Sequence, residues 1–195
     1  MANLKETLLN PIFKGNPITV LVLGICSSLA VTVQLKGALV MALSVTIVTG
    51  LSSLVVSMMR KSIPNRIRII VQLVVVSLMV ILVDQVLKAY AYSISKTLSV
   101  YVGLIITNCI VMGRIEAFAL SNKPVPSLLD GLANGAGYGM ILIIVAFFRE
   151  LLGSGTLLGF RVIPEAFYTA GYMNNGLVIL PPMALILLGL SLIHI

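Results

Sequence analysis

Six long apolar runs constrain this chain more than any other feature of its sequence. Runs of this length approach or match the ~20 residues that a helix needs to cross the hydrocarbon core of a bilayer. They are continuous, as in Ile141 to Phe148, where a membrane β-barrel would alternate apolar and polar residues. The sequence therefore predicts an all-α integral membrane protein with six transmembrane helices, at about residues 18–35, 38–59, 67–88, 98–113, 131–152 and 176–194.

Composition supports the same fold class and excludes several others. Of the 195 residues, 59% are hydrophobic and only 10% are charged, against about 25% charged residues in an ordinary soluble domain. Six spans leave only short loops, so we expect one membrane domain over residues 1–195 and no separate catalytic domain. The net charge of +7 comes mostly from residues that flank the apolar runs, which indicates membrane orientation rather than nucleic-acid binding.

The basic residues also predict how the chain is oriented. The densest basic stretch is the loop from Arg60 to Arg68, and the positive-inside rule places it in the cytoplasm. Six spans then put both termini in the cytoplasm. No convincing small-residue cleavage site follows the first span, so we expect the N-terminal segment 1–17 to be retained rather than removed as part of a signal peptide.

The first and fourth runs are short and are interrupted by small or polar residues. The interruptions lie in Val22–Leu29 and Leu104–Gly113, and each contains one of the two cysteines, Cys26 and Cys109. Equivalent positions are three spans apart, which divides the chain into halves at about 1–95 and 96–195. Because each half has an odd number of spans, the halves form inverted repeats. Broken half-helices in matching places are the usual indication of a central site in such a fold.

The two cysteines allow two interpretations. Free cysteine often serves as a small buried hydrophobe, but thiolates at both breaks also suit soft metals and iron–sulfur clusters. A [2Fe-2S] cluster normally takes four cysteines, and this chain has two together with a lone His194 at its far end. Cys26 and Cys109 would therefore form half of a metal site, completed by a second copy or a partner chain. A tetrahedral zinc site would need the same completion.

Two aspartates are the other candidate functional residues. Asp84 lies within a predicted span, so it is either functional or a helix-end acid paired with Lys88 one turn later. Asp130 precedes the fifth run, where an N-cap is the simpler interpretation.

The remaining charged and glycine patterns suggest structural roles. Arg149–Glu150, like Arg114 and Glu116, is expected to lie at the membrane interface. Gly135 and Gly139 predict close helix packing and not a nucleotide loop.

Four motifs carry a resemblance to a known family. The chain closely resembles the D-type membrane subunits of bacterial sodium-translocating NADH:quinone reductases, within the Nqr/Rnf family. The resemblance implies a six-helix subunit paired with a homologous, oppositely oriented E-type subunit, the two sharing one [2Fe-2S] cluster through two cysteines from each. By position, Cys26 and Cys109 are this chain's share. The matching motifs are Leu23–Thr32, Val83–Tyr90, Gly103–Arg114 and Phe147–Gly155.

The same resemblance implies a six-subunit translocase of the bacterial inner membrane, in which A-, B-, C- and F-type subunits complete the complex. NAD, FAD, FMN, riboflavin and quinone are expected in those other subunits, because nothing in this chain resembles a site for them. The chain would then belong to an enzyme without holding a complete active site. The family places candidate Na+-path acids at positions matching Asp84 and Asp130. Members usually continue into a polar tail, whereas this sequence stops at Ile195.

We therefore expect an electron-transfer subunit of a redox-driven sodium pump. One alternative is the E-type subunit of the related Rnf-type ferredoxin:NAD oxidoreductase, although Asn108–Gly113 looks more like the quinone reductase branch. Another is a secondary transporter without redox chemistry, which would give no reason for thiols at both breaks. A purely structural membrane anchor would leave the paired breaks unexplained.

Overall fold

The computed structural model describes residues 15–18, 20–64, 66–90, 102–157, 160–161 and 176–194. Almost every element in these residues is helical, which confirms the predicted all-α class. The exception is a pair of two-residue antiparallel strands, β1 (Thr156–Leu157) and β2 (Phe160–Arg161). The helices are α2 (Ile25–Val31), α3 (Leu35–Met59), α4 (Arg68–Tyr90), α6 (Val102–Ile106), α7 (Cys109–Arg114), the π-helix η1 (Ile115–Ala119), α8 (Pro124–Ser154), the 3-10 helix η2 (Gly176–Val178) and α10 (Pro181–His194).

Three helices within the described residues are long and apolar enough to cross a membrane: α3, α4 and α8. At 25 residues, α3 is about 37 Å long, which exceeds the ~30 Å hydrocarbon core. The sixth run forms the shorter α10, of 14 residues. The first and fourth runs form short helices instead of continuous spans. The arrangement of six spans as two inverted repeats therefore stays a prediction.

Some predicted features lie outside the described residues. These are residues 1–14 of the segment expected to be retained, residues 98–101 at the start of the fourth run, and Ile195.

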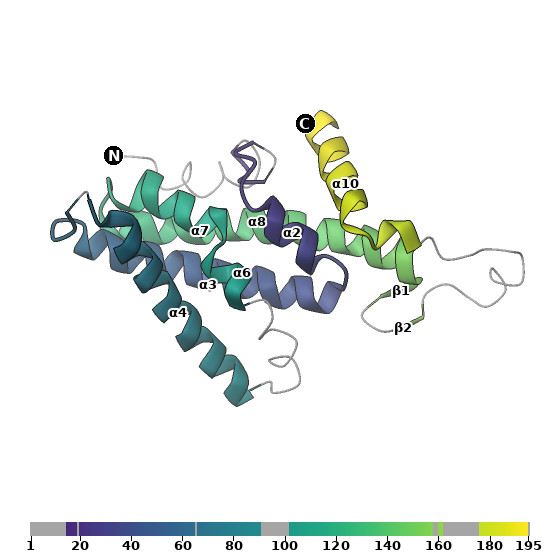
Figure 1. The fold of residues 1–195 in the computed structure, drawn as a ribbon, viewed down its shortest axis with the longest axis horizontal. Coiled ribbons are helices and arrows are strands. Elements are labelled where there is room, and N and C mark those ends of the chain that lie inside the picture. Colours follow the sequence, from purple (N-terminus) through teal and green to yellow (C-terminus); the bar gives the residue numbers. More distant parts are fainter. Residues whose placement is uncertain are drawn as a thin grey trace, which may run out of the picture.

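Helices α3 and α8 form the centre of the fold and run side by side along their lengths (Figure 1). Glycines of α8 permit this approach. A Cβ atom on Gly135 would lie 2.6 Å from the Thr46 Cα, and one on Gly139 would lie 2.9 Å from the Ala42 Cβ. Neither position has room for a side chain, so the predicted close packing through this pair of small residues is confirmed.

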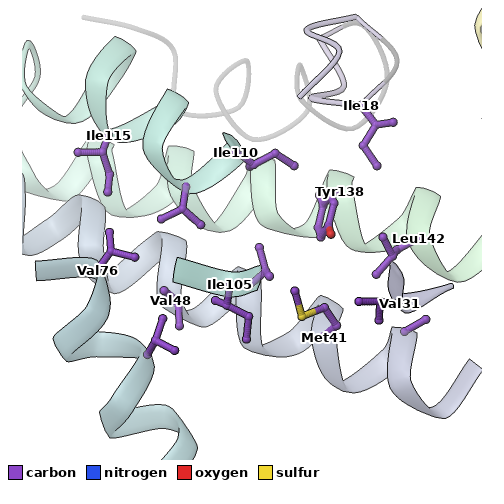
Figure 2. Close-up of a cluster of buried hydrophobic side chains, with 14 of the residues drawn as sticks. Ile18, Val31, Met41, Val48, Val76, Ile105, Ile110, Ile115, Tyr138 and Leu142 are labelled. Atoms are coloured by element: carbon purple, nitrogen blue, oxygen red, sulfur yellow. The ribbon is translucent and has the colours of Figure 1, made fainter. Parts of the chain in front are cut away.

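The shorter helices complete an apolar core around this pair. Figure 2 shows side chains from α3, α7 and α8 converging, with Met41 and Val48 on one side and Ile110, Tyr138 and Leu142 on the other. Ile110 and Leu142 are fully buried. Because α7 follows the break in the fourth run, this packing fixes the broken segment against the long helices.

The prediction that Arg149 and Glu150 are interfacial charges is wrong, because the structure buries both. Arg149 donates hydrogen bonds to the Val178 carbonyl at 3.1 Å and to the Thr32 hydroxyl. Glu150 accepts a hydrogen bond from the backbone N–H of Leu35, the first residue of α3. Helix ends carry backbone groups without intrahelical partners, and these two side chains satisfy them inside the protein.

The Glu116 prediction fits the structure better. Glu116 is half-exposed, forms an ion pair with Arg68, and accepts a hydrogen bond from Gln72 at 2.8 Å. These contacts join η1 to the start of α4, close to the basic loop at residues 60–68.

Candidate functional site

The break in the first run lies just before Cys26. The chain turns through residues 20–24, and α2 begins at Ile25 with Gly24 as its N-cap in the left-handed conformation (φ 82°). A side chain at Gly24 would be strained by that φ, and its Cβ would lie 2.7 Å from the Ile110 Cδ1. Glycine is therefore required here for two reasons, and Cys26 follows in the first turn of α2.

The break in the fourth run lies just before Cys109. Helix α6 ends at Ile106 and α7 begins at Cys109, with Asn108 as its N-cap. The Asn108 side-chain oxygen accepts a hydrogen bond from the Ile110 N–H at 3.1 Å, as N-cap asparagines commonly do. The predicted interruptions are thus present in both runs, and each places a cysteine at the start of a short helix.

The two breaks contact each other directly. The Asn108 Nδ2 donates a hydrogen bond to the Ser27 Oγ at 3.2 Å, and the Ser27 Oγ also lies 2.7 Å from the Tyr138 hydroxyl of α8. Ser27 is the neighbour of Cys26 in sequence, and Asn108 is the neighbour of Cys109. The structure therefore brings together the two backbone positions that sequence analysis singled out.

Both cysteines are free thiols and both are exposed, whereas Ser27 and Asn108 are each only 3% exposed. A cysteine that merely filled the core would be buried. Exposure of both sulfur-bearing residues beside a buried contact is what a site completed by another chain requires.

The donor set in this chain fits half of such a site. Among the described residues, no group of three or more His, Cys, Asp and Glu side chains is placed to hold a metal ion. Two thiols match half of the four cysteine ligands that a [2Fe-2S] cluster takes. The remaining ligands would have to come from outside the described residues, as a site shared with another chain implies.

Asp84 forms the ion pair that one of its two interpretations predicted. Its Oδ2 lies 2.6 Å from the Lys88 Nζ, one turn along α4. The side chain of Asp84 is only 13% exposed, however, and within the described part of the chain its Oδ1 is buried without a hydrogen-bond partner. The pairing thus satisfies one carboxylate oxygen and leaves the other free.

The prediction that Asp130 is an N-cap is wrong. Helix α8 begins at Pro124, so Asp130 lies inside it, and it is 4% exposed. Its carboxylate accepts hydrogen bonds from the Arg114 Nε at 2.9 Å and Nη2 at 2.5 Å, and from the Asn134 Nδ2 at 3.1 Å. The helix starts before the apolar run, and the proline at its first position is compatible with this, since proline is well tolerated in the first turn of a helix.

Sequence reasoning missed the residues that connect these features across the fold. Tyr138 and Arg149 both lie on α8 and bond to the first broken segment, yet they are more than 100 positions from it in sequence. Only one signal could have identified Tyr138. It is a hydroxyl-bearing aromatic residue within a run of glycines in an apolar helix, where a buried hydroxyl needs a partner.

Comparison with known proteins identifies close relatives over almost the whole chain. The family described as "Rnf-Nqr subunit, membrane protein" matches residues 4–192. The chain is 60% identical over 185 residues to the D subunit of the Na(+)-translocating NADH-quinone reductase of Haemophilus influenzae strain Rd, covering 95% of this chain and 89% of the relative. It is 57% identical over 187 residues to the proteins of the same name from Pseudomonas aeruginosa strain PAO1 and Pseudomonas paraeruginosa, covering 96% of this chain and 84% of each relative.

Proposed function

This chain belongs to the Rnf-Nqr family of membrane subunits, and we propose that it is the D-type subunit of a sodium-translocating NADH:quinone reductase. In that complex it is embedded in the membrane and contributes to a translocase without holding a complete active site. Its specific contribution is half of a shared [2Fe-2S] site, through Cys26 and Cys109.

The single observation that carries this proposal is the contact between the two breaks. Ser27 and Asn108 are buried and hydrogen-bonded at 3.2 Å, while the cysteine next to each is exposed. This arrangement leaves two exposed cysteines beside one buried, hydrogen-bonded contact. A homologous E-type subunit of opposite orientation would supply two more thiolates and complete the four-cysteine set.

A [2Fe-2S] cluster, when bound, supplies one-electron transfer within the membrane. The role of this chain is then to hold its two thiolates in place and to shield the site from water on one side. Flavin, NAD and quinone chemistry belongs to the A-, B-, C- and F-type subunits, because nothing in this sequence resembles a site for those cofactors. Electrons would pass between the two faces of the bacterial inner membrane, with both termini of this chain in the cytoplasm.

For the transported sodium ion we place the candidate at Asp84 rather than at Asp130. The Asp130 carboxylate is neutralised by two hydrogen bonds from Arg114, so an ion would have to displace the guanidinium. Asp84 is also paired, through its Oδ2 with Lys88, but its Oδ1 is buried without a hydrogen-bond partner in the described part of the chain. A carboxylate of that kind, close to the end of a membrane helix, can bind a cation with less rearrangement.

Two alternatives share part of this support. The family also includes Rnf-type subunits, and an Rnf-type E subunit would hold the same kind of cluster beside a ferredoxin-dependent complex. A secondary transporter is favoured by the broken segments themselves, since discontinuous helices commonly line substrate sites. A complex that accepts electrons from ferredoxin instead of donating electrons from NADH to quinone would be of the Rnf type. A complex without iron would be a secondary transporter.

The experiment that tests the proposal is analysis of the purified complex for iron and acid-labile sulfide, with its paramagnetic resonance spectrum after reduction. We expect a [2Fe-2S] signal and NADH-dependent quinone reduction. A complex that transports sodium but contains no iron–sulfur signal would contradict the proposal and favour the transporter.

A further inference from the structure

We propose that Tyr138 is a positioning residue for the cysteine pair, acting through the hydroxyl of Ser27 and the amide of Asn108. This inference rests on the proposed function, because its consequence is the geometry of the shared cluster site. Tyr138 lies on α8, the long helix that packs against α7 and is hydrogen-bonded to Ser27 of α2. None of the three side chains is itself a ligand.

The three hydrogen bonds of the Ser27 hydroxyl together determine which group is the donor in each. The Ser27 hydroxyl donates its single proton to the Gly24 carbonyl at 2.9 Å. Its two lone pairs are then available, and they accept from the Tyr138 hydroxyl at 2.7 Å and from the Asn108 Nδ2 at 3.2 Å. Ser27 therefore uses its full hydrogen-bonding capacity, and Tyr138 must be the donor.

Asn108 is also used at both ends of its side chain. Its Nδ2 reaches Ser27 while its Oδ1 caps α7 through the Ile110 N–H. Because the network is buried, each lost hydrogen bond would leave a polar group unpaired in an apolar interior. Separating any of the three side chains would therefore cost the free energy of leaving a buried polar group unpaired.

A phenylalanine at position 138 could fill the same apolar space as the tyrosine ring, so the hydroxyl contributes hydrogen bonding and not packing. Its side chain is completely buried among apolar residues (Figure 2), and a buried hydroxyl is tolerated only with a hydrogen-bond partner. Its shortest such contact is with Ser27, the serine that adjoins Cys26. The contact thereby anchors the first cysteine-bearing segment, and through Asn108 the second, to one long helix.

Anchoring matters because the cysteine-bearing helices are short. Helix α2 has seven residues, and α7 has six before it continues into η1, lengths at which an isolated helix is only marginally stable. Apolar packing holds each segment against the core, but the network links the two cysteine-bearing starts to each other by hydrogen bonds, and both thiolates must reach one small cluster. Losing such supporting residues around a metal site typically costs about 10- to 100-fold in metal affinity.

The chain offers a matched control for this inference. Ser28 follows Ser27, is equally buried, and donates to the same Gly24 carbonyl, at 3.0 Å. Both serines face the Tyr138 hydroxyl, but within the residues that the structure describes only Ser27 is hydrogen-bonded to Asn108. Ser27→Ala and Ser28→Ala thus remove the same atom from adjacent positions in α2, and only the first breaks the link between the segments.

The test compares Tyr138→Phe, Ser27→Ala and Ser28→Ala in the purified complex. The readouts are the paramagnetic resonance line shape, the cluster midpoint potential and the loss of iron to an added chelator. For Tyr138→Phe and Ser27→Ala we expect normal assembly, a broadened signal, a shifted potential and about 10-fold or greater loss of iron affinity. Ser28→Ala should match the wild type.

The possible outcomes separate this inference from the proposed function. If the wild-type complex has a cluster and all three variants match it, the positioning role is overturned while the cluster proposal stands. If the wild-type complex has no cluster, the proposed function fails first. Should Tyr138→Phe prevent assembly, Asn108→Ser keeps the N-cap oxygen but removes the donor to Ser27, and it must reproduce the spectral change.

Discussion

The buried ion pair between Arg114 and Asp130 makes Asp130→Asn an informative substitution. The Asp130 side chain is 5% exposed and the Arg114 side chain 17%, with two hydrogen bonds between them. The pair connects Arg114, the last residue of the helix that begins at Cys109, to Asp130 in α8. Asparagine keeps the shape and one acceptor oxygen, so the substitution removes mainly the charge.

The expected cost follows from the burial of the pair. Removing one partner of a buried pair costs about 3–5 kcal/mol, because the other charge is left uncompensated. Asparagine can still accept one hydrogen bond from the guanidinium, and Arg114 keeps its contact with the Phe118 ring at 5.7 Å. We therefore expect Asp130→Asn to lower the free energy of unfolding by the lower end of this range, about 3 kcal/mol.

Thermal stability of the purified complex measures this effect. For a chain of this size, about 3 kcal/mol corresponds to a decrease in Tm of about 6–12 °C. The control is the double variant Arg114→Gln with Asp130→Asn, which replaces the ion pair by a neutral amide pair. Its destabilisation should be smaller than the sum of the two single effects, by about 0.5–3 kcal/mol.

Two results would refute this reasoning. An unchanged Tm for Asp130→Asn would mean that the pair contributes nothing to stability. A normal Tm with an altered sodium requirement would mean that Asp130 lies on the ion path, contrary to the choice of Asp84.

Three further substitutions test other parts of the account. Asp84→Asn should raise the sodium concentration for half-maximal turnover with the cluster signal intact, and an unchanged sodium dependence would reduce Asp84 to the partner of Lys88. Gly135→Ala should lower the Tm of the complex by an amount equivalent to about 1–3 kcal/mol, because the new Cβ meets the backbone of α3; Gly103→Ala, with open space at its Cβ, should be nearly neutral, and equal effects would contradict the packing argument. Arg149→Met should destabilise the complex by at least about 3 kcal/mol, since it removes hydrogen bonds to the ends of two segments, and a thermal scan that matches the wild type would show those bonds to be dispensable.

The sequence predicts the local features of this fold well. Continuous apolar runs predict helices, and the polar interruptions at Ser27 and Asn108 predict breaks, because both signals depend on neighbouring residues. Gly135 and Gly139 predict close packing since small residues at that spacing have one common use in membrane helices.

Long-range partners cannot be predicted in the same way. The sequence favours a helix start at Asp130 because its partner, Arg114, belongs to a different helix, and nothing local indicates that the two meet. It favours the interface for Arg149 because a charged residue at the end of an apolar run usually faces water. In this fold, backbone carbonyls of two other segments lie within reach, at Leu29 and at Val178–Ile179, and they make burial of the guanidinium favourable.

The cysteine site was predictable in part: its local features could be predicted from the sequence and its long-range contact could not. Their matching breaks are visible in the sequence, and so is the insufficiency of two thiols for a four-cysteine cluster. That the two breaks contact each other through Ser27 and Asn108, with the thiols outward, required the three-dimensional arrangement.

The most direct test of the account is the cluster signal in Cys26→Ser and Cys109→Ser complexes. Serine keeps the size of the side chain but removes the soft thiolate ligand. We predict that either substitution abolishes the [2Fe-2S] paramagnetic resonance signal and quinone reduction while the complex still assembles. A full signal and normal turnover in both variants would contradict the account and return Cys26 and Cys109 to the role of small apolar side chains.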